Sequence, residues 1–256
     1  MVFQANIKEY VLLTVRLYFT KTKDAKYISH LDLVRCFTRA IRRSQVDIWY
    51  TEGFSSRPYL LFALPLSLGI ESIYEVVDIR VKSESISNEL IYSLNDFLPE
   101  GIEIFKYTLT EGKKNNISAA KYNIEFIDTE ENIDTLSNVI DNTILKPETI
   151  LVDKKSKRGI ILTDIKNQIH EISYTMKDDK ILLAITVDAG NANNLNPILI
   201  VTKILENIDF SPDYSIIRTG ILTNDGNSFK NRSEFTNNLV DISRNSRKFL
   251  QNSTCI

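Results

Sequence analysis

The 256-residue chain has only two cysteines and two histidines, and their positions limit the chemistry that can be expected of it. Cys36 and Cys255 are far apart, so no disulfide framework is expected, and Cys36 is best interpreted as a buried residue. His30 and His170 also form no metal-binding spacing with each other or with the cysteines. No C-x-x-x-C-x-x-C set is present to hold an iron–sulfur cluster. We therefore expect neither a metal nor a cofactor.

Long apolar runs and glycine-rich phosphate loops are missing as well. No segment approaches ~18 uninterrupted apolar residues, and the N-terminus has no basic region followed by an apolar stretch and a small-residue cleavage site. Neither G-x-x-x-x-G-K nor G-x-G-x-x-G occurs. Eight glycines and six prolines are too few for a long disordered linker. These absences predict a globular cytoplasmic protein with no membrane partner.

The net charge of -2 hides an uneven distribution of charge along the chain. Residues 1–60 carry five more basic than acidic side chains, so the rest of the chain is strongly acidic. Such a split favours a basic face that attracts a phosphate backbone locally. The alternative is an arginine-rich helix face that is simply solvated.

Residues 29–44 have the pattern of a capped amphipathic helix, with Ser29 as N-cap and Asp32 three residues later. The side expected to face a core is apolar at helical spacing: Leu33, Val34, Phe37, Ala40 and Ile41. The opposite side carries one acid and four arginines: Asp32, Arg35, Arg39, Arg42 and Arg43. Because most of these guanidinium groups share one stripe, the helix is predicted to face a polyanion.

Aromatic and basic residues follow this helix closely. Trp49 and Tyr50 point to opposite faces of any strand, so at most one of them would join a binding site. A loop over 52–58 is expected to fold back toward the arginine stripe. Its notable residues are Glu52, Gly53, Phe54, Arg57 and Pro58. Arginine offers forked donors to phosphate and a flat face for stacking on bases, and the aromatic residues would supply stacking partners.

His30 lies in the first turn of the predicted helix and has two interpretations. As a neutral imidazole near several arginines, it could act as a general base on a ribose hydroxyl. Alternatively, it hydrogen-bonds to the loop over 53–58 and positions it.

Strand and helix patterns alternate along the chain in an order that recurs. In the first half, strands are predicted at 11–20, 46–50, 60–68, 77–81 and 102–109, and helices at 29–44 and 85–97. In the second half, strands are predicted at 122–126, 149–152, 168–175, 181–187 and 215–222, and helices at 133–140 and 196–208.

Apart from one additional strand in each half, the order of these elements is that of the split βαβ, or ferredoxin-like, arrangement. We therefore predict an α+β protein of two ferredoxin-like units in tandem. The first unit spans 1–112 and includes the basic helix, and the second spans 117–222. A polar, partly disordered tail follows over 223–256.

Three consecutive motifs also carry a family resemblance. They read S-H-L-D-L-x-R-x-F-x-R-A-x-R-R, Y-T-E-G-F-x-x-R-P and F-A-L-P-L-x-x-G-x-E-S. Together they resemble the radical SAM-linked protein family, an uncharacterised bacterial family encoded beside, or fused to, a radical SAM protein. The match is dense over 27–72 and thins beyond residue 120 to Asn196-Pro197 and Arg218-Thr219. It departs near Val46, where the family usually has a proline, and at Ser55-Ser56, where it has Asn-Pro.

These observations predict a non-catalytic RNA-binding or substrate-presenting partner of a radical SAM enzyme, acting in RNA modification or processing. One alternative is a metal-independent RNA-processing enzyme that uses His30. Another is a protein-interaction module that docks on an acidic partner. The predicted binding residues are His30, Asp32, Arg35, Arg39, Arg42, Arg43, Tyr50, Glu52, Gly53, Phe54, Arg57 and Pro58.

Overall fold

The computed structural model describes residues 12–44, 46–82, 87–110, 117–127, 132–156, 159–177, 179–190 and 193–223. Residues 113–116, between the two predicted units, and the predicted tail from residue 224 onward lie outside these residues.

The first half of the chain contains four strands and two α-helices within the described residues. They are β1 (Leu13–Lys21), the 3-10 helix η1 (Lys23–Tyr27), α1 (His30–Arg43), β2 (Leu60–Phe62), β3 (Glu71–Val81), α2 (Asn88–Asn95) and β4 (Ile102–Thr110).

The second half repeats this alternation with additional elements. They are β5 (Ile117–Ile127), α3 (Ile133–Ile140), the π-helix η2 (Asp141–Leu145), β6 (Leu151–Ser156), β7 (Gly159–Asp164), the 3-10 helix η3 (Lys166–Gln168), β8 (Ile169–Lys177), β9 (Lys180–Asp188), α4 (Ile198–Leu205) and β10 (Asp213–Thr223).

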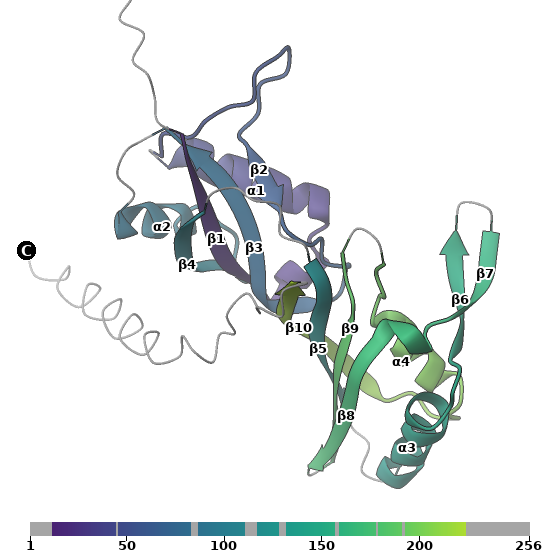
Figure 1. Ribbon diagram of the computed structural model, residues 1–256. Helices are drawn as coiled ribbons and strands as arrows, with labels where there is room; N and C mark the ends of the chain where they lie inside the picture. Colours follow the sequence, from purple (N-terminus) through teal and green to yellow (C-terminus); the bar gives the residue numbers. More distant parts are fainter. Residues whose placement is uncertain are drawn as a thin grey trace, which may run out of the picture.

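Eight strands form one mixed sheet in the order β4-β1-β3-β10-β5-β9-β8, with β2 also paired to β3 (Figure 1). In the first half, the order β4-β1-β3-β2 is antiparallel throughout. In the second half, β10-β5-β9-β8 has the same relative order and again only antiparallel neighbours among the described residues. The halves join where Glu71 and Ser72 pair in parallel with Ile217 and Arg218. The fold is therefore α+β, dominated by a large mixed sheet.

Two predicted strands of the first half differ from the structure. The segment at 46–50 makes only isolated bridges, Ile48 with Val81 and Tyr50 with Pro58. The chain then leaves the sheet and resumes pairing with β3 at Leu60, and β2 ends at Phe62, before the proline at position 65. A proline cannot donate to a strand ladder, which explains why the predicted strand over 60–68 is so short.

β3 begins at Glu71, well before the predicted strand at 77–81. Its residues are almost continuously buried, because this central strand is covered on both faces. Val77, Ile79 and Val81 belong to one hydrophobic core, whereas Tyr74 and Val76 belong to the other. Burial on both faces removes the alternation by which half-buried strands are recognised in a sequence.

The two cores differ in which helices cover them. The first lies between α1 and the first half of the sheet, and its buried members include Val15, Leu17, Phe19, Leu33, Phe37, Ala40, Ile41, Val77, Ile79 and Ile104. The second packs α3 and α4 on the second half of the sheet and continues onto the other face of β3. β3 therefore separates the two cores.

β6 and β7 form a separate two-stranded sheet between α3 and β8. The sequence pattern predicts a short strand at 149–152, but pairing continues from Leu151–Asp164 to Ser156–Gly159. Ile160, Ile161 and Leu162 follow one another in β7 and are all exposed. The hairpin projects from the rest of the chain in Figure 1.

A buried ion pair lies where the two halves of the sheet join. Arg218 is fully buried, and its Nη2 donates to both carboxylate oxygens of Glu75 at 2.5 Å and to the Leu64 carbonyl at 2.8 Å. Lys21 is also buried and donates to the Ile28 carbonyl at 2.8 Å. Burial lowers the pKa of the Lys21 ammonium; Glu75 opposes this shift and Arg218 adds to it. Charges from β1, β3 and β10 thus meet at this junction.

The first stability prediction concerns the core face of α1. Phe37 is fully buried, and its ring lies 5.0 Å from that of Phe19 and 5.5 Å from that of Phe62. Phe37→Ala should lower the free energy of unfolding by roughly 3–5 kcal/mol, measured by urea denaturation. Arg39→Ala, on the exposed face of the same helix, should change it by no more than ~0.5 kcal/mol. Equal losses in the two variants would show that the helix faces are assigned wrongly.

The second stability prediction concerns the junction between the half-sheets. Arg218→Met should lower the free energy of unfolding by about 3–5 kcal/mol, because it leaves the Glu75 carboxylate buried without its partner. The double variant Arg218→Met/Glu75→Leu should recover most of this loss, since both members of the ion pair are removed and the Lys21 ammonium still donates to the Ile28 carbonyl. A double variant as unstable as the single one would mean that shape, and not charge, determines stability here.

Candidate nucleic-acid interface

The ends of α1 are fixed by side chains close to it in sequence. Ser29 Oγ accepts a hydrogen bond from the Asp32 backbone N–H at 3.2 Å and donates to the Asp32 carboxylate at 2.7 Å. At the other end, the Ser44 backbone N–H donates to the Ala40 carbonyl, and Ser44 Oγ donates to the Ile41 carbonyl. The predicted N-cap is confirmed. These caps satisfy backbone groups that a helix terminus would otherwise leave unpaired.

Four of the five apolar residues predicted to face a core are buried: Leu33, Phe37, Ala40 and Ile41. Val34 is only half-buried, because it lies at the border between the two faces of the helix. Cys36 is half-buried as well, and not fully buried as predicted. Burial raises the pKa of its thiol, and the nearby Arg39 guanidinium opposes that shift.

The outer face of α1 is basic and exposed. Its charged members are Asp32, Arg35, Arg39, Arg42 and Arg43, and all five are exposed. Arg35 forms an ion pair with Asp32, with 2.7 Å between Nη1 and Oδ1. Within the described part of the chain, Arg39, Arg42 and Arg43 have no ion-pair partner. These three guanidinium groups are available to an external anion.

The predicted loop stands away from α1. Its base is closed by the Tyr50–Pro58 bridge and by a hydrogen bond of 2.8 Å from the Thr51 backbone N–H to the Arg57 carbonyl. Residues 52–57 are all exposed, and the ring of Phe54 is fully exposed. Figure 1 shows the loop projecting beyond the sheet. The expectation that it folds back toward the arginine stripe is therefore wrong.

The two residues at the base of the loop and the turn glycine explain its shape. Tyr50 is partly buried against the first core, and Pro58 is buried. Both are therefore less accessible than the exposed residues of the loop. Gly53 has a φ of 118°, which side chains with a Cβ rarely adopt. The glycine thus permits the turn that carries Phe54.

His30 is exposed at the start of α1, and its ring lies 5.2 Å from that of Phe62 in an edge-to-face arrangement. Phe62 is part of β2, so this contact joins the first turn of the helix to the short edge strand. Among the described residues, no hydrogen bond connects His30 to the loop over 53–58. The prediction that His30 hydrogen-bonds to this loop and positions it is therefore wrong.

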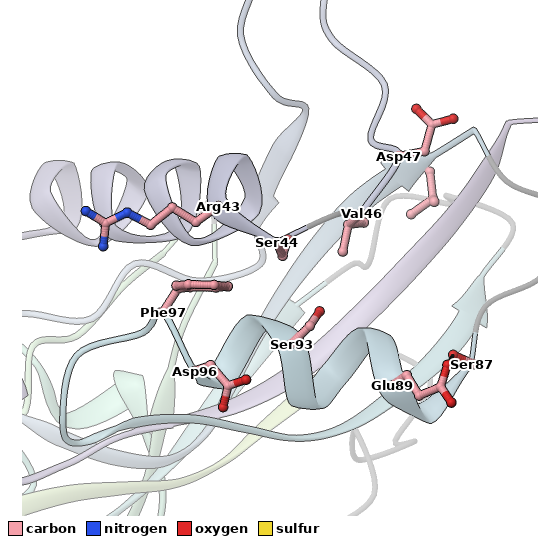
Figure 2. A pocket seen from close by; sticks show the side chains of 10 residues that line it. Arg43, Ser44, Val46, Asp47, Ser87, Glu89, Ser93, Asp96 and Phe97 are labelled. Atoms are coloured by element: carbon pink, nitrogen blue, oxygen red, sulfur yellow. Dashed lines mark hydrogen bonds between the residues drawn. The ribbon is translucent and has the colours of Figure 1, made fainter.

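A pocket of about 560 Å³ lies between the C-terminal end of α1 and α2 (Figure 2). Its lining residues are Arg43, Ser44, Val46, Asp47, Val81, Ser87, Glu89, Ser93, Asp96 and Phe97. The carboxylates of Asp47, Glu89 and Asp96 outnumber the single guanidinium group of Arg43 in this lining. The pocket is therefore acidic, whereas the outer face of α1 is basic. The pocket therefore marks the limit of the basic surface.

Trp49, Tyr59 and Arg80 form a stacked group that the sequence does not single out. The Arg80 guanidinium carbon lies 4.4 Å from the ring centroid of Tyr59 and 5.3 Å from that of Trp49. Ile79 and Val81 point into the first core, so the alternation of β3 places Arg80 on the opposite face of the sheet. The alternation of Arg80 with the apolar residues Ile79 and Val81 is the one signal in the sequence that places Arg80 on this face.

Two other kinds of site are absent from the part of the chain that the structure describes. No group of three or more histidine, cysteine, aspartate or glutamate residues is arranged to hold a metal ion there. In the same residues, no helix has the length and apolar character needed to span a membrane.

Residues 14–197 match a family described as "Uncharacterized protein conserved in bacteria (DUF2344)". The chain belongs to this family. No curated protein matches it. The matched range includes α1, the projecting loop and the stacked group, but ends before β10.

Two solved structures resemble the fold distantly. A chain of the "Crystal Structure of a Cbf5-Nop10-Gar1 Complex" is 11% identical, with a TM-score of 0.42 over 81% of this chain and 48% of that one. This chain therefore spans about half of its length. An unknown protein from Galdieria sulphuraria is also 11% identical, with a TM-score of 0.26 over 81% and 99% of the two chains. Similarities this weak carry no functional argument.

A prediction follows for the Asp32 carboxyl. Its hydrogen bonds from Ser29 and Arg35, together with the charges of Arg35 and Arg39, lower its pKa below the ordinary aspartate value. This carboxylate therefore stabilises the fold above the pKa of an unfolded aspartate, about 4, and the contribution is lost as pH falls through the lower folded-state pKa. Ser29→Ala should raise the pKa of Asp32 in a carbon-detected NMR titration. An unchanged value would mean that the cap does not act on this carboxyl.

Proposed function

We propose that the outer face of α1 and the projecting loop bind single-stranded RNA, and that the protein presents this RNA to a radical SAM enzyme without catalysing a reaction itself. The observation that carries the proposal is the group of three exposed arginines, Arg39, Arg42 and Arg43, without ion-pair partners among the described residues.

The spacing of these arginines supports a polyanionic ligand. Residues three and four apart are neighbours on a helix surface, and like charges at that spacing destabilise the helix slightly. Arg43 follows Arg39 by four residues and Arg42 follows it by three. A phosphate backbone would relieve this repulsion and accept hydrogen bonds from the forked guanidinium groups.

Phe54 supports the choice of an unpaired strand. Its ring is fully exposed on a loop whose neighbouring residues, Gly53, Ser55 and Ser56, are small. Stacking of a base on an aromatic side chain contributes about 1–3 kcal/mol and requires a base that is accessible from its face. Arg57 lies near the loop base and adds a further exposed cation.

The proposal extends to the architecture. We interpret the two halves, 1–112 and 117–222, as ferredoxin-like units in tandem, because each has the relative strand order that the split βαβ arrangement requires. In this interpretation β6 and β7 are an insertion in the second unit. Fold alone implies no function, so the RNA assignment depends on the arginine face.

A presenting role suits the site better than a catalytic one. A catalytic base is typically oriented by a further polar group, whereas among the described residues the ring of His30 lies against the apolar ring of Phe62. The resemblance to the radical SAM-linked family supports a companion that supplies the chemistry. A cytoplasmic location follows from that partnership.

We expect Arg39→Gln/Arg42→Gln/Arg43→Gln to lower the affinity for a labelled single-stranded oligoribonucleotide about 100-fold at ~0.1 M salt. Each lost phosphate contact lowers the logarithmic salt slope by about 0.7, so three contacts lower it by about 2. Fluorescence anisotropy over a salt series measures both quantities. Arg35→Gln alone should have a smaller effect than any one of the three, because Arg35 already pairs with Asp32.

The matched control removes three lysines of the second half, Lys146, Lys180 and Lys203, and so makes the same change in net charge. Its affinity and salt slope should stay near those of the unmodified protein. If the triple arginine variant also binds as the unmodified protein does, RNA is not the ligand of this face, and an acidic protein surface becomes the partner to test.

A further inference from the structure

Arg80 lies at the base of the projecting loop. The segment at 46–50 pairs with β3 before the loop, and β2 pairs with β3 after it. The Trp49 backbone N–H donates to the Arg80 carbonyl at 2.8 Å, and the Tyr59 backbone N–H donates to the Trp49 carbonyl at 3.2 Å. Immediately beyond, Leu60 resumes pairing with Ile79. Trp49 and Tyr59 therefore flank the base of the loop, one on each side, and both lie beside Arg80.

The guanidinium group of Arg80 lies over two neighbouring aromatic rings. It lies 4.4 Å from the Tyr59 centroid and 5.3 Å from the Trp49 centroid, and the two rings are 6.0 Å apart. A guanidinium stacked on rings still has its N–H groups directed outward in its own plane. These groups remain able to bind a phosphate by a forked hydrogen bond.

Three other charged groups on this sheet face have protein contacts of their own. Arg16 and Asp78 form a buried bidentate pair, with 2.7 Å between Nε and Oδ1 and 2.8 Å between Nη2 and Oδ2. Lys106 lies over the ring of Tyr18. Among the described residues, Arg80 has neither an ion-pair partner nor a hydrogen-bond acceptor for its side chain, although it is half-buried. A half-buried cation favours an anion that replaces its lost hydration.

We propose that Arg80, which lies over the rings of Trp49 and Tyr59, is a second phosphate subsite for the same RNA. This inference depends on the proposed function and extends it to the sheet face opposite α1. The projecting loop leaves the sheet at Trp49 and Tyr59, which contact Arg80, so an RNA strand that stacks on Phe54 can place one phosphate at the base of the loop and another on α1. The arginines of α1 supply one contact and Arg80 supplies the other.

The chain offers a direct reporter for this subsite, because Trp49 is its single tryptophan. Binding of a single-stranded oligoribonucleotide should change the emission of Trp49 with the same midpoint as the anisotropy signal. Arg80→Gln should abolish the emission change, weaken binding about fivefold at ~0.1 M salt and lower the salt slope by about 0.7. Lys106→Gln makes the same charge change on the same sheet face and should leave the emission change intact.

Thermal unfolding first establishes that each variant is folded. If Arg80→Gln does not fold, Arg80→Lys tests the subsite instead. Lysine keeps the positive charge but lacks the forked guanidinium group, so the change in Trp49 emission on RNA binding should fall by about half or more. If Arg80 only braces the loop, RNA leaves Trp49 emission unchanged in the unmodified protein, and that result overturns the subsite.

A second titration with inorganic phosphate at constant ionic strength identifies the source of the anion. Saturation of the Trp49 signal by phosphate, with no response to RNA, would assign the subsite to a free anion and overturn the proposal. Failure of the α1 proposal is distinguished by a different result: the triple α1 variant binds RNA with unchanged affinity, whatever Trp49 reports.

Discussion

The ion pair between Arg218 and Glu75 is the interaction on which the continuity of the sheet depends. Among the described residues, only two residue pairs join β3 to β10, so the backbone contact between the half-sheets is small. The guanidinium group compensates by binding the Glu75 carboxylate and the Leu64 carbonyl together. Because both charges are buried, neither can be removed alone without a large desolvation cost. The pair therefore specifies how the two halves meet.

Arginine has two different roles in this chain, one in the fold and one at the surface. The partners of each guanidinium group determine which role it has. Arg16 and Arg218 are buried and bound to carboxylates, so their charges serve the fold. Arg39 and Arg42 are exposed on α1 without such partners in the described region, and Arg80 lies over two aromatic rings. Composition does not distinguish these classes. Only the spatial pairing of carboxylates with arginines separates the structural cations from those available to a ligand.

The sequence predicted those features that depend on residues close to one another in the chain. The cap at Ser29, the buried face of α1 and the exposed arginines all follow from helical spacing, and the structure contains them. The direction of the loop over 52–58 and the short β2 were not predicted, because they depend on the pairing of Ile48 and Leu60 with β3, far away in the sequence. Arg80 was missed for the same reason, since its stacking partners come together when the loop closes. Non-local pairing leaves no periodic signal in the sequence.

The distance in sequence between Glu75 and Arg218 also has a consequence for folding during synthesis. The two residues are separated by 143 positions. At about 5–20 residues per second, a ribosome needs roughly 7–30 s to extend the chain from one to the other. For most of that interval β1 to β4 are complete, yet the Glu75 carboxylate lacks its guanidinium and Tyr74 and Val76 lack the second core. The nascent first half thus exposes an apolar strip beside an unpaired acid, which is the kind of surface that chaperones shield until the final strand arrives.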